Sequence, residues 1–336
     1  MSAIDTLCYA RGSHPCPLGL AAQLGWFLDE FRGEGIRVFT ASSSANLDQQ
    51  EPHSIRQGGN VGALWARACG MRTRIVALTW TDEFQGILVR PADGLRESGD
   101  LRGLRLALPS CGRLVDSTRT ETLHGFLVTL ADAGLGPADA QFVDVEADPL
   151  QRVAARANFG APYSEYARQI GALLRREVDA VYVKGARGLR AGLAAGAQLL
   201  VDLRDLSDPW TRVHAGTPRP ITANQALIDE HPRIVARFLA RVLEVGEWAA
   251  AHPAETVAYL SRETHCDPAH VLAAYGNDVH LRMGSSLDAG ALDLLRAQNR
   301  FLFDWGFIPR LVDIDEWLDP APLRQAQQLR RELASI

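Results

Sequence analysis

The sequence predicts an α/β protein with two domains. The chain has 336 residues, and globular domains commonly hold about 100–200 residues, so two are expected. Short apolar segments typical of strands alternate with helical patterns between residues 18 and 203. Such alternation favours parallel sheets covered by helices. Beyond residue 227 the patterns are nearly all helical, which a simple tandem of two α/β domains would not produce.

The first α/β series precedes residue 90. Apolar side chains recur on one helical face over residues 18–31, which predicts an amphipathic helix. A second helix is expected to begin with Asn60 as its cap and to stop at Gly70. Apolar runs predict strands at 35–41, 73–79 and 84–89.

A second series follows the stretch 91–99, which is rich in Pro, Gly and Ser. Strands are expected at 104–108, 142–145, 179–183 and 199–203. Helices are expected at 118–134, begun by a capping box of Thr118 and Glu121, and at 163–177. After an apolar run at 220–227, helical patterns cover 231–250, 253–263, 268–278, 287–304 and 321–334.

This order predicts a discontinuous first domain interrupted by an inserted second one. We expect residues 1–98 and 220–336 to form the first domain and residues 99–219 to form the second. The helical tail then packs on the first domain.

Composition excludes several classes of partner. The net charge is −5 with no block of like charges, so we expect neither nucleic acid nor an anionic membrane surface as a partner. We expect no membrane insertion, because no run of about 18 uncharged apolar residues occurs. The first twenty residues lack the pattern of a signal peptide, which predicts a cytoplasmic protein; a truncated N-terminus would make it periplasmic.

Cofactor and metal motifs are also missing from the sequence. No P-loop, no dinucleotide fingerprint after a strand and no GxSxG motif is present. The five cysteines form no CxxC pair and the nine histidines form no HExxH motif. We therefore expect free thiols, no metal site and no cofactor.

Cys16 is the most informative single residue. Pro17 follows it and a helical pattern starts at once, so Cys16 is expected at the N-cap of that helix. There a thiolate faces unpaired backbone N–H groups and the positive end of the helix dipole, which lowers a cysteine pKa. The alternative is a small capping residue or a buried thiol without chemistry.

The segment Arg56-Gln57-Gly58-Gly59-Asn60 is a candidate anion site. Two glycines before a helix let successive backbone N–H groups converge on an anion. An adjacent arginine adds a charge-assisted clamp for an oxyanion. The alternative is a tight turn beside a solvated arginine.

Two further turns follow expected strands of the second domain. Ser110 and Cys111 lie after the strand at 104–108, and Lys184 closes the strand at 179–183. Carboxyl ends of parallel strands are the usual place for ligand contacts in α/β sheets. Lys184 is the only lysine in the chain, yet a solvated side chain is an equal alternative, and Cys111 has the alternative of a neutral turn residue.

Two histidines are near these residues in the sequence. His14 precedes Cys16 by two residues, and His53 precedes Arg56 by three. Either is a candidate acid or base beside a thiol, although catalytic partners are more often close in space than in sequence.

The same residues resemble a known family. The motifs resemble 2′-hydroxybiphenyl-2-sulfinate desulfinases, within the superfamily of nitrate, taurine and sulfonate substrate-binding proteins of transporters. The resemblance rests on residues 14–27, 55–70, 77–94, 100–110 and 178–183. It implies a type II periplasmic-binding-protein-like fold, in which two α/β domains enclose a ligand cleft.

The resemblance also implies roles for individual residues. Cys16-Pro17 matches the catalytic cysteine of the family, and Arg56-Gln57-Gly58-Gly59 matches its sulfinate-binding motif. The family histidine about ten residues before that arginine corresponds to Asn46 here, and His53 is offset by seven positions.

Two functions remain open. The first is a hydrolase that uses Cys16, with Arg56 and His53, to cleave the C–S bond of an organic, aromatic sulfinate and release sulfite. The second is a binding protein without catalysis that delivers a sulfonate, nitrate-like or aromatic-acid anion to an ABC permease. In both, the partner is a small organic anion. The expected contacts to that anion come from Asn46, Gly58, Gly59, Asn60, Ser110, Cys111 and Lys184.

Overall fold

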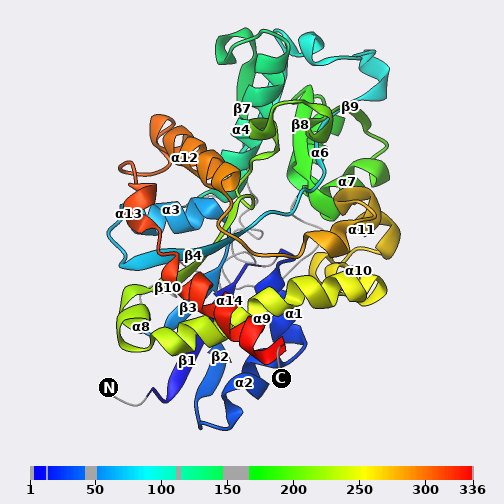
Figure 1. The fold of residues 1–336 in the computed structure, drawn as a ribbon. Coiled ribbons are helices and arrows are strands. Elements are labelled where there is room, and N and C mark those ends of the chain that lie inside the picture. Colours follow the sequence, from blue (N-terminus) through cyan, green and yellow to red (C-terminus); the bar gives the residue numbers. More distant parts are fainter. Residues whose placement is uncertain (1–3, 13, 42–50, 111–114, 147–165, 335–336) are drawn as a thin grey trace. The chain divides into compact units, whose positions relative to one another are not determined.

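The computed structural model describes residues 4–12, 14–41, 51–110, 115–146 and 166–334. The chain divides into two compact units. The first comprises 1–81, 216–259 and 278–336, and the second comprises 82–215 and 260–277. Each unit contains a five-stranded sheet covered by helices (Figure 1).

The sheet of the first unit is mixed, with the strand order β2-β1-β3-β10-β4. Its members are β1 (Thr6–Arg11), β2 (Arg37–Thr40), β3 (Ser54–Gln57), β4 (Thr73–Thr79) and β10 (Arg219–Asn224). Strand β1 pairs in parallel with β2 and β3, whereas β10 runs antiparallel to both β3 and β4. All six residues of β10 are buried.

The sheet of the second unit has the order β7-β6-β8-β5-β9. Its members are β5 (Gln85–Val89), β6 (Arg105–Ser110), β7 (Gln141–Glu146), β8 (Ala180–Lys184) and β9 (Gln198–Asp202). Strand β6 pairs in parallel with β7 and β8, while β5 runs antiparallel to β8 and β9. Each sheet is therefore mixed, not purely parallel as predicted.

Helices of the first unit cover its sheet. They are α1 (Pro17–Gln23), α2 (Trp26–Arg32), α3 (Asn60–Ala68), α8 (Gln225–Glu230), α9 (Pro232–Ala251), α12 (Ala289–Asp304), α13 (Ile314–Trp317) and α14 (Ala321–Ala334). The C-terminal helix α14 packs along α9 (Figure 1). The aromatic rings of Phe27 in α2 and Phe238 in α9 stack at 3.9 Å between centroids. This packing fixes α9 beside the amino-terminal helices.

In the described part of the second unit the helices are α4 (Ser117–Asp132), α6 (Ala167–Leu174), α7 (Gly185–Ala194) and α11 (Pro268–Tyr275). Helix α10 (Pro253–Thr264) contains the point where the chain passes from the first unit to the second. Short 3₁₀ segments occur at 91–93, 98–101, 137–139, 203–205, 209–212 and 279–282. Buried apolar side chains of β5, β6, β8 and α4 make the core of this unit, including Ile87, Leu106, Phe126 and Tyr182.

The unit boundaries differ from the predicted ones because of strand pairing. The first unit ends near residue 81 instead of 98, since β5 hydrogen-bonds to β8 and β9 of the second sheet. Residues 260–277 join the second unit instead of the first, because α11 packs on α7.

Several predicted helices have different limits. The helix expected at 18–31 is two helices, since Gly25 adopts a left-handed conformation with φ of 80° between them. Helix α4 is capped by Asp116, whose side chain accepts from the Arg119 N–H, not by a box of Thr118 and Glu121. The start of the helix expected at 163–177 lies outside the described residues; α6 spans Ala167–Leu174. Within the described ranges, no helix has the length and apolarity that a membrane span requires.

Candidate functional site

Cys16 lies at the N-cap of α1, as predicted. Its backbone is extended, Pro17 occupies the first helical position, and its Sγ accepts a hydrogen bond from the Gly19 N–H at 3.4 Å. Cys16 is buried, with 1% of its surface exposed. A backbone N–H directed at sulfur stabilises the thiolate more than the thiol.

Tyr259, which is 243 residues from Cys16 in the sequence, hydrogen-bonds to the Cys16 backbone. Its hydroxyl accepts from the Cys16 N–H at 3.1 Å and donates to the Cys16 carbonyl oxygen at 2.9 Å. The same hydroxyl excludes any larger residue at Gly19, since a Cβ there would lie 2.4 Å from it and 3.3 Å from the Cys16 Sγ. The thiol is therefore held in one position by contacts on both sides.

Gln57 joins the cysteine helix to the predicted anion turn. It ends β3, and its side-chain oxygen accepts from the Leu18 N–H in the first turn of α1 at 2.9 Å. Its amide nitrogen donates to the Thr79 hydroxyl at the end of β4 at 3.0 Å. Gln57 is fully buried, so this residue of the Arg56–Gly59 motif positions the helix that begins at Cys16.

Arg56 folds back over Gly58. A Cβ at Gly58 would lie 2.4 Å from Nη1, 2.5 Å from Cζ and 2.6 Å from Nη2 of Arg56. Only glycine leaves room for a guanidinium this close to the backbone. The first glycine of the motif thus places the positive charge at the carboxyl end of β3, where α3 begins.

The second glycine, Gly59, is the N-cap of α3 and has no side chain to bond the first helical N–H groups. This is an arrangement that favours an anion at a helix start. Asn60 is the first helical residue, not the cap that we predicted. Its side chain donates to the Pro218 carbonyl at 3.0 Å and accepts from Gln298 at 3.3 Å, and it is buried. The side chain of Asn60 is therefore bonded within the first unit, and its backbone N–H at the helix start is a candidate for ligand binding.

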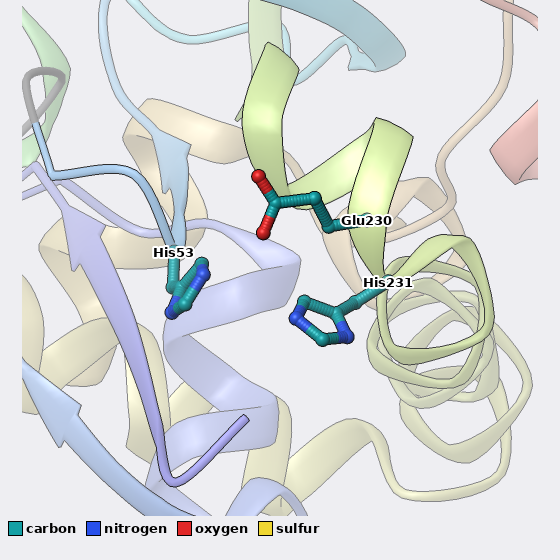
Figure 2. A group of neighbouring side chains, drawn as sticks. All are labelled: His53, Glu230 and His231. Carbon is teal, nitrogen blue, oxygen red and sulfur yellow. The ribbon is translucent and has the colours of Figure 1, made fainter. Parts of the chain in front are cut away.

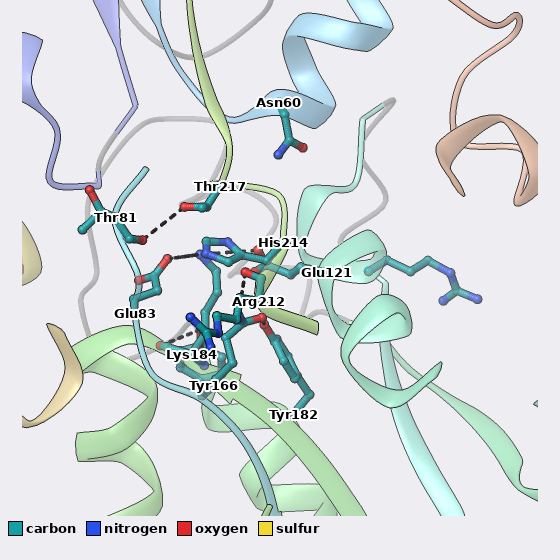
Figure 3. Close-up of polar contacts among 12 residues, drawn as sticks. Asn60, Thr81, Glu83, Glu121, Tyr166, Tyr182, Lys184, Arg212, His214 and Thr217 are labelled. Atoms are coloured by element: carbon teal, nitrogen blue, oxygen red, sulfur yellow. Dashed lines mark hydrogen bonds and ion pairs between the residues drawn. The ribbon is translucent and has the colours of Figure 1, made fainter. Parts of the chain in front are cut away.

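Lys184 lies in a buried polar cluster of the second unit (Figure 3). Its ammonium nitrogen is 3.1 Å from Glu83 and 3.4 Å from Glu121, and the His214 Nε2 is 3.2 Å from the same Glu83 oxygen. The Tyr275 hydroxyl donates to the other Glu83 oxygen at 3.1 Å. Lys184, which the sequence predicted as a cationic contact to a ligand, is therefore paired with two buried carboxylates.

Sequence reasoning missed the two glutamates because their positions gave no signal. Glu83 precedes β5 and Glu121 lies in α4, and their burial follows from strand pairing: Gln85 of β5 stands opposite Lys184 of β8. Tyr182 beside them is fully buried, and desolvation, aided by the negative charges of Glu121 and Glu83, raises its pKa well above the ordinary value.

The structure does not bring His53 to Cys16. His53 precedes the first residue of β3, whereas Gln57 at the last residue of β3 contacts the cysteine helix. Four residues of extended strand span about 13 Å. His53 lies instead beside His231, with ring centroids 5.4 Å apart. His14, the other candidate, is partly exposed.

The remaining predicted contacts are only partly described. Asn46 and Cys111 lie outside the described residues, and Ser110 is the last residue of β6 and partly exposed. None of the described cysteines, namely Cys8, Cys16, Cys69 and Cys266, forms a disulfide, and Cys69 alone among them is exposed.

Comparison with known proteins supports the predicted resemblance. No protein-family model matches the chain. The chain is 26% identical to the 2′-hydroxybiphenyl-2-sulfinate desulfinase of Rhodococcus erythropolis, over 97% of this chain and 95% of that protein. The desulfinase of Rhodococcus qingshengii matches with the same identity and coverage.

Solved structures give the same picture for the fold. The crystal structure of the desulfurization enzyme DszB has a TM-score of 0.76 at 24% identity, covering 97% of this chain and 99% of that one. A cysteine-to-serine mutant of DszB in complex with biphenyl-2-sulfinic acid also has a TM-score of 0.76. The aliphatic sulfonate-binding protein SsuA of Escherichia coli follows with 0.67 at 16% identity, over 94% of this chain and 92% of that chain. The predicted type II periplasmic-binding-protein-like fold is thus confirmed, and the chain is similar along nearly its whole length to a sulfinate desulfinase.

Proposed function

We propose that the protein is a desulfinase-like hydrolase that cleaves the C–S bond of an organic, aromatic sulfinate. The observation that carries the proposal is the link from Cys16 through Gln57 to the Arg56 turn. One hydrogen bond of 2.9 Å, from the Leu18 N–H to Gln57, ties the cysteine helix to the motif that binds sulfinate in the resembled family. A protein that only binds an anion does not need a thiol at this place.

The reaction balances without a cofactor. A sulfinate and water give the desulfinated organic compound and hydrogensulfite: the C–S bond breaks, carbon receives a proton, and sulfur receives the oxygen of water. Arg56 and the N–H groups at the start of α3 hold the sulfinate oxygens and neutralise negative charge that develops on them. Cys16 is either the nucleophile that attacks sulfur or the proton donor to carbon.

We place the other predicted residues in supporting roles. Gln57, Tyr259 and Gly19 position the thiol through the contacts described above. Lys184, buried between Glu83 and Glu121, holds the structure of the second unit rather than contacting the anion. We propose His14 rather than His53 as the acid or base beside the thiol, because β3 separates His53 from it.

The experiment is sulfite release from biphenyl-2-sulfinate and from alkyl sulfinates. We expect release by the wild type from the aryl compound, and a loss of at least about 100-fold in kcat for Cys16→Ser, the range typical of a lost acid, base or nucleophile. Cys69→Ser removes an exposed thiol and is the matched control, which retains full activity. No release from any sulfinate, or full activity of Cys16→Ser, contradicts the proposal.

A binding protein without catalysis is the second candidate, and the structural neighbours favour it. They include the putative sulfonate-binding protein of Methylobacillus flagellatus, with a TM-score of 0.74 over 98% of this chain and 96% of that one. In this case the anion partner is a sulfonate or similar ion delivered to an ABC permease, and the location is periplasmic instead of cytoplasmic. Calorimetry separates the two: sulfonate binding that is unchanged in Cys16→Ser, with no turnover of sulfinates, supports the binding protein.

A further inference from the structure

Three potential metal ligands that belong to no sequence motif lie close together, namely His53, Glu230 and His231. One donor atom of each lies within 4.8 Å of the donors of the other two (Figure 2). By plane geometry some point lies no more than about 2.8 Å from all three donors, which exceeds the 2.0–2.2 Å of zinc ligands by at most about 0.8 Å. Small side-chain rotations would close the difference.

The backbone that carries these side chains is fixed. The His53 carbonyl accepts from the Cys8 N–H at 2.9 Å, which anchors the start of β3 to β1. Strand β10 runs antiparallel to β3 with Ala223 opposite Ile55, so β10 ends near the start of β3 and leads directly into α8. This topology brings a segment near residue 230 back to residue 53.

A break between two helices lets neighbouring residues face one centre. In a continuous helix, residues i and i+1 point about 100° apart. Glu230 ends α8, and His231 has φ −135° and ψ 52° before Pro232 starts α9. Proline disfavours a helical residue before it, and the resulting turn directs both side chains toward His53 (Figure 2).

His231 supplies an independent indication of a ligand. It is 9% exposed, and its Nε2 is buried without a hydrogen-bond partner in the part of the chain that the structure describes. A buried polar atom left unpaired is costly, and such atoms often mark a missing ion or water. Figure 2 shows the ring edge of His231 that lies away from its backbone turned toward His53, and Nε2 belongs to that edge.

We propose that these three residues bind a divalent transition ion of the zinc class. Two imidazoles and one carboxylate are a donor set that zinc uses where one position stays open to water, whereas Mg²⁺ and Ca²⁺ take oxygen ligands. The ion ties the start of β3 to the α8–α9 turn within the first unit. It lies at the amino end of β3, about 13 Å of strand away from the contact that Gln57 makes with the cysteine helix.

The test is titration of the chelator-treated protein with Co²⁺, followed by competition with Zn²⁺. We expect stoichiometric binding, a cobalt spectrum without the sulfur charge-transfer band that Cys69 would produce, and a higher melting temperature with Zn²⁺. Mutation of a residue that only hydrogen-bonds to a metal ligand weakens metal affinity 10–100-fold. Loss of a ligand itself should cost more, so Glu230→Gln, His53→Ala and His231→Ala should each weaken binding by about 100-fold or more.

The controls separate this site from others. His280→Ala changes a partly exposed histidine outside the group, and Cys16→Ser changes the proposed catalytic thiol; both should bind Co²⁺ like the wild type. Glu230→Gln alters an exposed side chain of equal size and keeps the test valid where His231→Ala fails to fold. No stoichiometric binding, or wild-type affinity in Glu230→Gln and His53→Ala, overturns the proposal.

Discussion

At the scale of single residues, the proposed chemistry depends on two glycines. Gly19 leaves space for the Tyr259 hydroxyl beside the Cys16 thiol, and Gly58 leaves space for the Arg56 guanidinium. In each case a Cβ would lie closer than 3.0 Å to a functional atom. Both glycines are therefore needed because they lack a side chain at these two places, and not because they make a loop flexible.

Replacing Gly58 with alanine tests this argument. The new methyl group would occupy the position of the Arg56 guanidinium, which is flexible enough to swing away, so the fold is kept and the anion contact is lost. We expect at least a tenfold rise in KM for an aryl sulfinate, or in Kd for a bound sulfonate, because a charge-assisted hydrogen bond contributes about 1.5–3 kcal/mol.

Gly33→Ala is the matched control for this change. No atom lies within 4 Å of the position its Cβ would take, and its φ is −67°. Wild-type KM in Gly58→Ala, or an equal effect of both substitutions, would show that Arg56 does not contact the anion.

The buried side chain of His124 makes the stability of the second unit depend on pH. It is fully buried against Trp210, with ring centroids 4.4 Å apart. Desolvation lowers its pKa from 6.5 to about 3, partly opposed by a hydrogen bond with the Val213 backbone. The unfolded chain therefore takes up a proton between pH 6.5 and 3 that the folded chain does not.

From this shift we expect stability to fall as the pH is lowered from 6.5 to 3. The shift in pKa sets an upper limit of about 5 kcal/mol for this residue. In His124→Phe that part of the pH dependence should disappear, which urea unfolding at several pH values measures. A variant with the same slope as the wild type would contradict the neutral, buried state of His124.

At the scale of elements, strand ends bring the polar residues together. In the first unit, β1, β3 and β4 end at Arg11, Gln57 and Thr79, and Gln57 bonds to both α1 and Thr79. In the second unit, the start of β5 and the end of β8 adjoin because the two strands are antiparallel. The buried pair of Glu83 and Lys184 follows from that pairing.

Lys184→Met should destabilise the protein by about 3–5 kcal/mol, because it leaves Glu83 and Glu121 buried without their cation. Adding Glu83→Gln should restore part of the loss by removing one of the two negative charges. Denaturant unfolding of the single and double variants measures both effects. A single variant as stable as the wild type would mean that Lys184 is not part of the structure of this unit.

The sequence predicted those elements whose pattern is local. Strand β4 has the predicted limits 73–79. Cys16 caps α1 as predicted, because the proline that follows it favours the first position of a helix. The sequence pattern did not predict strands β1 and β3, because Thr6–Arg11 and Ser54–Gln57 are short and contain polar residues. Their identity depends on pairing with each other and not on their own composition.

The rest of the site depends on contacts between distant positions. Tyr259 lies 243 residues from Cys16, and His53 lies far along the chain from His231. No single-sequence pattern encodes such pairs. The histidine nearest Arg56 in sequence therefore suggested the wrong neighbour: in the structure it faces His231, while Gln57, which had no assigned role, contacts the cysteine helix.

At the scale of the whole molecule, two units of similar design share one chain that passes between them more than once. The first unit contains Cys16, Gln57 and the Arg56 turn, and also the proposed metal group at the other end of β3. The second unit contains the buried Lys184 cluster. The proposed hydrolysis therefore has its thiol and its anion-binding groups within one unit.

The most direct test of this account is a crystal structure of the Cys16→Ser variant with biphenyl-2-sulfinate bound. We expect the sulfinate oxygens on the Arg56 guanidinium and on the first N–H groups of α3. The sulfur, or the carbon bonded to it, should lie about 3–3.5 Å from the side-chain oxygen at position 16, the separation of reacting atoms in a productive complex. A sulfinate held by Arg56 but far from position 16, or bound elsewhere, would contradict the proposed hydrolysis.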